Sequence, residues 1–459
     1  MSDKKYFGTD GIRGRVGAEP VTAEFMLRVG HALGRVLRES GGGRADVLIG
    51  KDTRVSGYMF ESALEAGLVS AGAGAKLLGP MPTPAIAWLT RELGASAGIV
   101  ISASHNPYFD NGVKFFNAAG EKLSDELELA IEAALLQPMQ TVSSDLIGKA
   151  ARVADGVERY LAFLAASVEA LDLRGRRIVV DCAHGATYQI APRLFADLGA
   201  DIIAIGAQPD GFNINADCGA AHPQTLQRAV VDQKADLGIA FDGDGDRVQL
   251  VDHTGALVDG DDIVYLLARD LLARGLLKGP VVGTVMTNYG VERAIGALGV
   301  SFLRAKVGDR HVLQMLRDHG GTLGGEASGH VLCLDRATTG DGILTALLAL
   351  DTLQRAGISL AQARAGVTRL PQVTINLPIG GGAALIAQAT VRETHAAIEK
   401  ILKGRGRVVL RPSGTEPLVR VTVEGEDGDE VHRLAQNLAD AVKSAATNQR
   451  DDTEGHARK

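Results

Sequence analysis

The chain has 459 residues, of which 46% are hydrophobic and 22% charged, and its formal net charge is -7. This length exceeds what one hydrophobic core usually spans, so three or four domains are expected, and the balance of apolar and charged residues excludes a disordered chain. The negative net charge argues against a nucleic-acid partner, although local basic pockets could still hold small anions.

Cysteine usage and the N-terminal segment predict a cytoplasmic protein. Cys182, Cys218 and Cys333 lie far apart without metal-ligand spacing, which is typical of a reducing compartment. The first residues lack the apolar core of a signal peptide, and the longest candidate apolar helix, 343–350, is too short to span a bilayer. We therefore expect no membrane association.

The first part of the chain predicts strands and helices in alternation. A glycine-punctuated loop at 7–14 carries Arg13, and a loop at 51–54 adds further basic groups. Strands are expected at 46–49, 75–78 and 98–101, and helices at 24–40, 60–71 and 84–92. We assign residues 1–150 to domain 1.

The same alternation recurs twice. The second pass has strands at 177–181, 201–205 and 237–241 and helices at 190–198 and 226–233; the third has strands at 280–284, 301–305 and 322–324 and helices at 290–298 and 312–319. We assign 151–255 to domain 2 and 256–368 to domain 3. Each pass ends in a loop that carries polar or charged side chains, here called a chemically loaded loop. Ligands of α/β sheets bind beyond the carboxyl ends of strands, so these loops are candidates for a shared site. The alternative is three ordinary strand-to-helix turns.

After residue 368 the pattern changes. Strands are expected at 372–377, 407–410 and 418–424, and helices at 383–402 and 429–446. We assign 369–446 to domain 4, and the polar residues 447–459 predict a frayed tail. The expected fold class is α/β, with three related mixed α/β domains around a central cleft and a smaller α+β C-terminal domain.

Ser104 is the first candidate catalytic residue. It follows an apolar strand, within Ser-Ala-Ser-His-Asn-Pro at 102–107. Pro107 fixes its own backbone and disfavours a helical conformation at Asn106, so Ser104 and His105 are expected on an exposed, stiff loop. Loops of this kind often carry catalytic groups.

Asp242, Asp244 and Asp246 alternate with glycines and predict a metal site. Hard carboxylate oxygens suit Mg²⁺ or Ca²⁺, and Arg247 and His253 stand where a calcium-binding EF-hand needs Gly and Glu, which excludes that motif. Three carboxylates leave open positions, as Mg²⁺ has when a phosphate completes its shell. The alternative is a solvated acidic turn.

A second loop predicts an anion pocket. Arg411 begins Arg-Pro-Ser-Gly-Thr-Glu, so Ser413, Gly414 and Thr415 lie between two guanidiniums, the second being Arg420. Arginine binds phosphate in a bidentate manner, and the ending of a nucleotide P-loop is missing, so ATP binding is not indicated. A structural turn is the alternative.

Two further sets of residues complete the candidate site. Glu326, Ser328 and His330 alternate donors and acceptors in a way that suits sugar hydroxyls or an amine, and His330 could also move protons. A structural histidine is the alternative. Lys114 could neutralise a phosphoryl group or donate a proton, and its alternative is a solvated strand lysine.

Together these loops predict a reaction class. A serine without a triad pattern, a metal loop and separate arginines favour phosphoryl transfer through phosphoserine over acyl transfer. The metal and the basic groups would stabilise charge on the moving phosphoryl group.

Up to residue 446 the chain resembles the α-D-phosphohexomutase family. Four motifs occur in order: Ser-His-Asn-Pro at 104–107, Asp-Gly-Asp-Gly-Asp at 242–246, Gly-Glu-Ala-Ser-Gly-His at 325–330 and Arg-Pro-Ser-Gly-Thr-Glu at 411–416. The resemblance implies that Ser104 is phosphorylated and that the acidic loop binds one Mg²⁺ with the phosphoserine. It also implies that the third loop, with Arg247, binds the sugar phosphate, and that the fourth loop holds the phosphate that does not react.

The resemblance also implies a mechanism. Phospho-Ser104 would give its phosphoryl group to O1 of glucosamine 6-phosphate, and the 6-phosphoryl group of the bisphosphate would then return to Ser104. Lys114, Arg13 and His330 match positions linked in relatives to proton transfer and charge stabilisation, and His105 lies beside the phosphoserine. The general acid and the general base stay unassigned.

The spelling of the loops at 7–13 and 102–114 resembles the glucosamine branch of the family. The implied partner is a hexosamine phosphate, with glucosamine or glucose 1,6-bisphosphate as activator, and the implied role is supply of the precursor of UDP-N-acetylglucosamine for peptidoglycan synthesis. The alternatives are a phosphoglucomutase or phosphomannomutase of the same family, a non-catalytic sugar-phosphate binder and a simple phosphatase. A homodimer is one option for the assembly, which the sequence leaves open.

Overall fold

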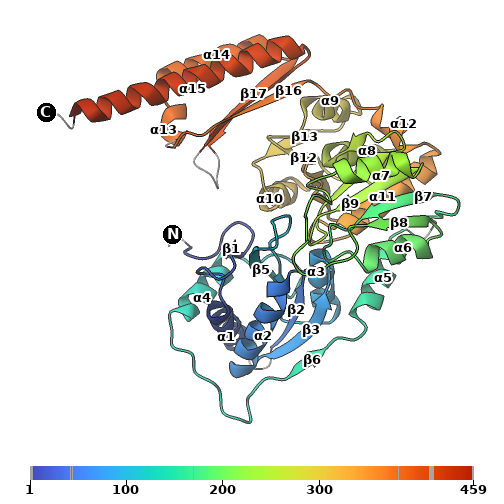
Figure 1. Cartoon of the computed structure of the whole chain (residues 1–459), viewed down its shortest axis with the longest axis vertical. Helices are drawn as coiled ribbons and strands as arrows, with labels where there is room; N and C mark the ends of the chain where they lie inside the picture. Colours follow the sequence, from blue (N-terminus) through green and yellow to red (C-terminus); the bar gives the residue numbers. More distant parts are fainter. Residues whose placement is uncertain are drawn as a thin grey trace. The chain divides into compact units, whose positions relative to one another are not determined.

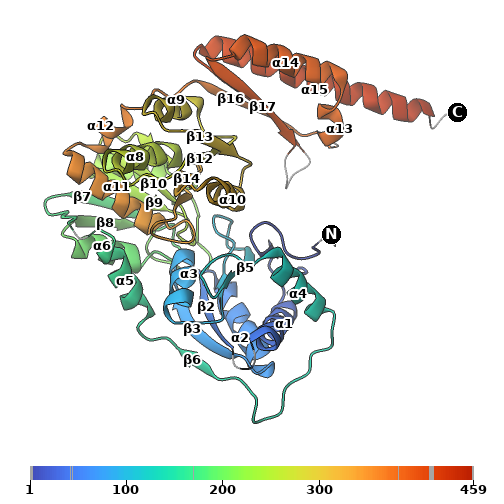
Figure 2. The same cartoon turned by 180° about the vertical axis from the view of Figure 1, so that it is seen from behind.

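The computed structural model describes residues 4–41, 43, 45–168, 170–380, 382–412 and 418–456, with 448–456 described by their backbone alone. These residues form two compact units (Figures 1 and 2). The first unit runs to Thr284 and includes Leu303–Ala365, and the second consists of Val285–Phe302 and the chain from Gly366 onward. No helix in the described part of the chain is long and apolar enough to cross a membrane.

The first sheet of the first unit has six strands in the order β1-β5-β4-β2-β3-β6. Its strands are β1 (Ile12–Arg15), β2 (Asp46–Lys51), β3 (Gly74–Pro80), β4 (Ala97–Ile101), β5 (Asp110–Asn117) and β6 (Ala150–Arg152). Its helices are α1 (Ala23–Gly41), α2 (Val55–Ser70), α3 (Thr83–Glu92) and α4 (Asp125–Leu135). Strand β2 is parallel to β3 and β4, and β5 returns antiparallel to β4. Every residue of β4 is buried, as its apolar sequence predicts.

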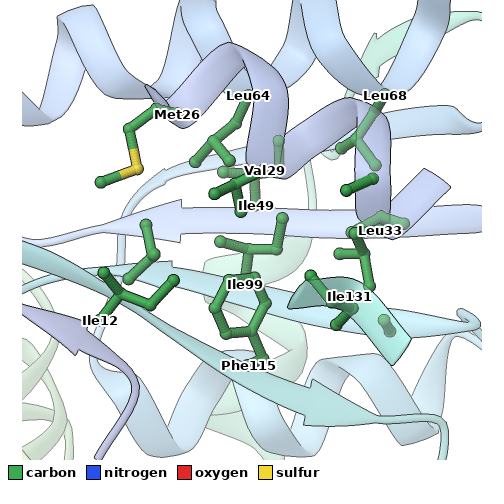
Figure 3. Close-up of a cluster of buried hydrophobic side chains, with 14 of the residues drawn as sticks. Ile12, Met26, Val29, Leu33, Ile49, Leu64, Leu68, Ile99, Phe115 and Ile131 are labelled. Atoms are coloured by element: carbon green, nitrogen blue, oxygen red, sulfur yellow. The ribbon is translucent and has the colours of Figure 1, made fainter. Parts of the chain in front are cut away.

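The core of this sheet lies under α1 and α2 (Figure 3). Val29 and Leu33 of α1 and Leu64 of α2 pack in one cluster with Ile49 of β2 and Ile99 of β4. Residues 29–34 of α1 are all buried, so the middle of this helix is enclosed around its whole circumference. This packing fixes the strand that delivers Ser104.

The second and third sheets have the orders β11-β10-β9-β7-β8 and β13-β12-β14-β15. Their strands are β7 (Arg177–Asp181), β8 (Asp201–Ile205), β9 (Leu237–Phe241), β10 (Val248–Asp252), β11 (Leu257–Val258), β12 (Val281–Thr284), β13 (Phe302–Ala305), β14 (Leu323–Gly325) and β15 (Val331–Cys333). The helices of this part of the first unit are α5 (Gly156–Ala166), α6 (Ile190–Asp197), α7 (Gln224–Asp232), α8 (Gly260–Ala273), α10 (Asp309–His319), α11 (Gly342–Ala356) and α12 (Leu360–Arg364).

The three sheets share one topology, which confirms the predicted repeats. In each, a central strand (β2, β7, β12) lies between the strand that follows it in the chain and a third strand (β4, β9, β14). Each third strand is parallel to the central one and is followed by an antiparallel strand (β5, β10, β15). The chemically loaded loops therefore connect antiparallel strands, and the alternative of strand-to-helix turns is excluded.

The second unit contains a three-stranded antiparallel sheet, β16-β18-β17, with helices α14 and α15 packed on it (Figure 1). Its elements are α9 (Tyr289–Ala297), β16 (Gln372–Leu377), α13 (Gly382–Ile386), α14 (Ala389–Leu402), β17 (Gly406–Pro412), β18 (Val419–Gly425) and α15 (Gly428–His456). Arg407 of β17 joins residues 285–302 to this sheet, because it pairs with Glu424 and donates hydrogen bonds of 2.5 and 2.7 Å to the carbonyls of Val285 and Thr287.

Several element limits differ from the sequence-based expectations. The predicted helix at 383–402 is two helices, α13 and α14, which end and begin on either side of Ala387 and Gln388. Helix α2 begins at Val55, earlier than predicted. The prediction of a frayed tail from 447 was wrong as far as His456, because α15 continues to that residue. A helix already formed extends one hydrogen bond at a time, so polar residues without proline can prolong it.

A buried tyrosine-carboxylate pair links α5 to α11 within the first unit. The hydroxyl of Tyr160 donates to Asp341 over 2.7 Å, and the backbone N–H of Leu344 donates to the same carboxylate over 2.9 Å as an N-cap. Burial raises the pKa of Asp341 to about 6, although the hydrogen bonds from Leu344 and Tyr160 oppose the shift. Trp88 on α3 stacks on Phe163 of α5 beside this pair, with ring centroids 4.8 Å apart.

Asp341→Asn should change how stability depends on pH. Because the folded-state pKa lies above the ordinary value of about 3.9, the contribution of Asp341 to stability is greatest below pH ~4 and declines until pH ~6. Asparagine does not titrate, so the free energy of unfolding of the variant relative to wild type should rise by roughly 2–3 kcal/mol between pH 4 and pH 7. Urea titrations followed by the fluorescence of Trp88, the one tryptophan in the chain, measure this difference. A difference that is equal at both pH values would contradict the assignment.

Candidate active site

Ser104 lies in the loop between β4 and β5. Its side chain is buried, with 1% exposure, so the prediction of an exposed loop was wrong for Ser104, whereas His105 is exposed. The Oγ of Ser104 donates to Asp242 over 2.7 Å and lies 3.4 Å from Nδ1 of His105. The burial arises because the metal loop covers the serine, a contact between distant segments that local turn chemistry does not reveal.

Three carboxylates form a cluster suited to a cation. Asp242, Asp244 and Asp246 are buried after β9, and one oxygen from each lies within 4.8 Å of the others. The Oδ1 atoms of Asp244 and Asp246 are buried and have no hydrogen-bond partner among the described residues. Burial, followed by the charges of Asp246 and Asp244, raises the pKa of Asp242 well above its usual range. Unsatisfied buried oxygens beside like charges fit a divalent cation and exclude a solvated acidic turn.

Lys114 lies on β5, opposite Val100 of β4, and its side chain points into the cluster. Its Nζ is 2.7 Å from Asp244, 3.2 Å from Asp246 and 3.3 Å from Asp10. Burial alone would lower the pKa of Lys114, but the three carboxylates outweigh burial and raise it above its ordinary value. Lys114 is therefore a buried, charged group and not a solvated strand lysine.

Charged residues that the sequence analysis did not single out extend this cluster. Lys122 contacts Asp10 over 2.7 Å and Asp309 over 2.5 Å. Burial opposes ionisation of both carboxylates, but nearby positive charges, chiefly Lys114 for Asp10 and Lys122 for Asp309, lower their pKa values. Asp10 lies between Thr9 and Gly11, in the loop just before β1, the strand that carries Arg13. The sequence signal that could have identified Asp10 was an acidic residue in a glycine-bearing loop beside Arg13.

His330 lies between the three-carboxylate cluster and Asp309. Its Nδ1 is 3.7 Å from Asp246 and its Nε2 is 3.9 Å from Asp309. Burial lowers the pKa of His330, but the interaction with the Asp246 carboxylate, followed by the charge of Asp309, raises it overall. Position 340 requires glycine, because a Cβ on Gly340 would lie 2.5 Å from the His330 ring. His330 is thus held beside two carboxylates, which favours a functional role over a structural one.

The other members of the third loop are placed differently. Glu326 is partly exposed and accepts a hydrogen bond of 3.0 Å from the backbone N–H of Gly308, while Ser328 is exposed. Their side chains are therefore accessible to a ligand from solvent. Arg247 follows the metal loop, donates its backbone N–H to Asp242 over 3.1 Å and places its Nε 3.8 Å from Asp246.

Arg13 and His105 border the serine loop. Arg13 pairs with Asp10, and its guanidinium lies 3.5 Å from the carbonyl of Ala103. Loss of solvation around the ring, then the positive charges of Arg247 and Arg13, lower the pKa of His105 to about 4. The first unit thus brings Ser104, His105, Arg13, Lys114, Arg247, His330 and the acidic triad together.

The predicted anion loop belongs to the second unit. Arg411 of β17 and Arg420 of β18 are cross-strand neighbours. Burial, followed by the charge of Arg420, lowers the pKa of Arg411, so a bound anion would relieve repulsion between the two guanidiniums. Ser413, Gly414 and Thr415 lie outside the described residues.

Comparisons with known proteins cover nearly the whole chain. Four models of the phosphoglucomutase/phosphomannomutase family match in order: α/β/α domain I at residues 4–141, domain II at 158–255, domain III at 259–370 and the C-terminal domain at 375–441. The predicted limits of the four domains remain a proposal beside these ranges.

Relatives and a solved structure agree with these models. The chain is 58% identical to a phosphoglucosamine mutase of Xylella fastidiosa over 448 residues, which is 97% of this chain and 100% of the relative. It is also 58% identical to a phosphoglucosamine mutase of Alkalilimnicola ehrlichii over 443 residues, 96% of this chain and 98% of the relative. A phosphoglucomutase/phosphomannomutase family protein from Burkholderia thailandensis has a TM-score of 0.81 at 26% identity, covering 97% of this chain and 98% of that one. The chain therefore belongs to the phosphoglucomutase/phosphomannomutase family, and the sequence-based prediction of a four-domain phosphohexomutase is confirmed.

Proposed function

We propose that the chain interconverts glucosamine 6-phosphate and glucosamine 1-phosphate with Ser104 as the phosphoryl carrier. The observation that carries the reaction type is the 2.7 Å contact of the Ser104 hydroxyl with Asp242, inside a buried triad of carboxylates. The choice of glucosamine is supported by relatives that are 58% identical over nearly the whole chain and are named phosphoglucosamine mutases.

The chain's own residues divide the work of the reaction. The bond from phosphorus to Oγ of Ser104 breaks as one forms to O1 of the sugar, and O1 loses its proton. In the second half the bond from phosphorus to O6 breaks as one forms to Oγ of Ser104, and O6 gains one proton, which balances the proton that O1 lost. Lys114 supplies a fixed positive charge next to the triad, and its contacts with three carboxylates hold it there.

Asp242, Asp244 and Asp246, together with the Ser104 side chain, would hold one Mg²⁺. The cation would offset negative charge on the phosphoryl group. Glucosamine or glucose 1,6-bisphosphate would serve as activator and intermediate. Glu326 and Ser328 are proposed to bind the sugar, and Arg411, Ser413, Gly414, Thr415 and Arg420 the phosphate that does not react. A homodimer remains a prediction.

The preferred sugar is measured by comparing kcat/KM for glucosamine, glucose and mannose 6-phosphates on one preparation with Mg²⁺. We expect glucosamine 6-phosphate to be preferred by at least about tenfold, because a protonated amine donates up to three charge-assisted hydrogen bonds, whereas an uncharged hydroxyl in its place donates one. Equal or better use of glucose or mannose phosphate would contradict the proposed substrate. Steady release of inorganic phosphate would indicate a phosphatase, and failure to convert any hexose phosphate a non-catalytic binder.

A further inference from the structure

The backbone of Ser104 is held in an unfavourable conformation. Its φ is 52°, in the left-handed region, which is unfavourable for a residue with a side chain. Such a conformation persists only where surrounding contacts enforce it. Its N–H donates to Oγ of Ser102 over 2.9 Å within the loop, and the contacts to its carbonyl come from elsewhere in the chain.

Two buried donors share the carbonyls of the serine loop. Nδ2 of Asn215 donates to the carbonyl of Ser104 over 2.9 Å and to that of Asn106 over 3.0 Å. One terminal nitrogen of Arg54 donates to the same two carbonyls over 3.1 and 2.5 Å. Arg54 has 0% exposure and Asn215 has 7%. Neither side chain contacts the Oγ of Ser104, so both act on the loop backbone.

The metal loop packs against the same point. A Cβ on Gly243 would lie 2.7 Å from the carbonyl of Ser104 and 2.7 Å from Nδ2 of Asn215. Glycine is therefore required here by close approach of three segments, those of Ser104, Gly243 and Asn215. Displacing the Ser104 carbonyl would also displace the Oγ of Ser104, which contacts Asp242 in the metal loop.

The segment that carries Asn215 is itself fixed to the first repeat. Asn215 has a φ of 59° and donates its N–H to the carbonyl of Ala183 over 2.8 Å. In the first repeat, the hydroxyl of Thr53 donates to the carbonyl of His184 over 2.5 Å, and the N–H of Val55 donates to the carbonyl of Gly211 over 3.0 Å. Asn215 is thus anchored beside Arg54 by backbone contacts on both sides.

We propose that Asn215 and Arg54 are positioning residues that hold Ser104 in the geometry needed for phosphoryl transfer, an inference that rests on the proposed function of Ser104. Asn215 belongs to the second repeat and Ser104 to the first, so this contact sets the serine relative to the metal loop. Because both side chains bond the backbone of the serine loop, losing either should affect the rate of the chemical step and not substrate binding.

Asn215→Gly tests the proposal, with Asp217→Gly as the matched control. Both positions are left-handed, and glycine adopts that conformation readily; Asp217 has a φ of 53°, is exposed and makes no contact with the serine loop among the described residues. We expect Asn215→Gly to lower kcat roughly 10- to 100-fold with KM within about twofold, and Asp217→Gly to match wild type. Arg54→Lys keeps the positive charge but loses the planar guanidinium group, so its kcat should lie between those of Asn215→Gly and Asp217→Gly.

Hydrogen exchange separates this inference from the proposed function. In the sugar-free enzyme, the amides of residues 102–106 should exchange faster in Asn215→Gly than in wild type or Asp217→Gly. Unchanged exchange in Asn215→Gly would show that Asn215 does not hold the serine loop in place. Faster exchange with unchanged kcat would show that holding the loop is not needed for phosphoryl transfer. Faster exchange together with a wild-type enzyme that converts no hexose phosphate would leave the contact in place and refute the proposed function of Ser104.

Discussion

Ser104→Ala should remove mutase turnover while leaving the fold in place. The variant lacks the oxygen that lies 2.7 Å from Asp242 and is proposed to carry the phosphoryl group. Alanine and serine accept a left-handed backbone at similar cost, and Asp242 keeps its hydrogen bond from the N–H of Arg247, so the effect on stability should be small. We expect kcat to fall at least ~100-fold, because no second group takes over a covalent step.

Turnover of Ser104→Ala is measured with saturating bisphosphate and Mg²⁺, and intact-mass analysis reports whether a phosphoryl group is attached. Ser62→Ala is the control, because that exposed hydroxyl on α2 bonds only the carbonyl of Tyr58 among the described residues. The control should keep full activity and the same phosphorylation as wild type. Residual turnover of more than a few per cent in Ser104→Ala would show that the phosphoserine mechanism is wrong.

The sequence correctly predicted those features that depend on neighbouring residues, such as the carboxylate cluster and the three repeats. The Asp-Gly-Asp-Gly-Asp stretch predicted the carboxylate cluster because glycine spacing lets a short loop turn three side chains toward one point. The three repeats were predictable for a similar reason, since each buried strand is a short apolar run bounded by turn residues. The shared order of the three sheets follows from that repetition.

Features built from distant segments were not predictable. Asp10, Lys122 and Asp309 meet only in the folded chain, and in the sequence Lys122 and Asp309 each have the pattern of an ordinary surface charge. The burial of Ser104 and the contact from Asn215 likewise depend on how two repeats pack. Local sequence preferences do not describe contacts between distant segments. The loop motifs were therefore identified from the sequence, whereas the residues that hold them in place were not.

Lys114→Met should destabilise the metal-free protein and make its stability depend on Mg²⁺. In wild type the ammonium of Lys114 compensates Asp10, Asp244 and Asp246 in a nearly dry environment. Methionine fills a similar volume without charge, so the carboxylates are left uncompensated, and breaking a buried pair in this way costs about 3–5 kcal/mol. A divalent cation in the triad would restore positive charge and recover part of that loss.

Thermal unfolding with Mg²⁺ or with chelator measures this effect, and Lys122→Met is the matched control. Lys122 also compensates two carboxylates, Asp10 and Asp309, but it contacts none of the triad. Both variants should unfold at lower temperature than wild type, and only Lys114→Met should show a larger Mg²⁺-induced rise in Tm. Equal rises in the two variants would contradict the proposed cation site.

Lys114→Arg then distinguishes a charge from a proton donor. The arginine keeps the positive charge but has a different shape and holds its proton more firmly. If Lys114 acts as a fixed charge, this variant should keep a near-wild-type Mg²⁺ effect on Tm and a measurable fraction of turnover. Lys114→Met should instead lose turnover and show the larger Mg²⁺-induced rise in Tm. Complete loss of turnover in Lys114→Arg with wild-type stability would instead assign proton transfer to the ammonium group.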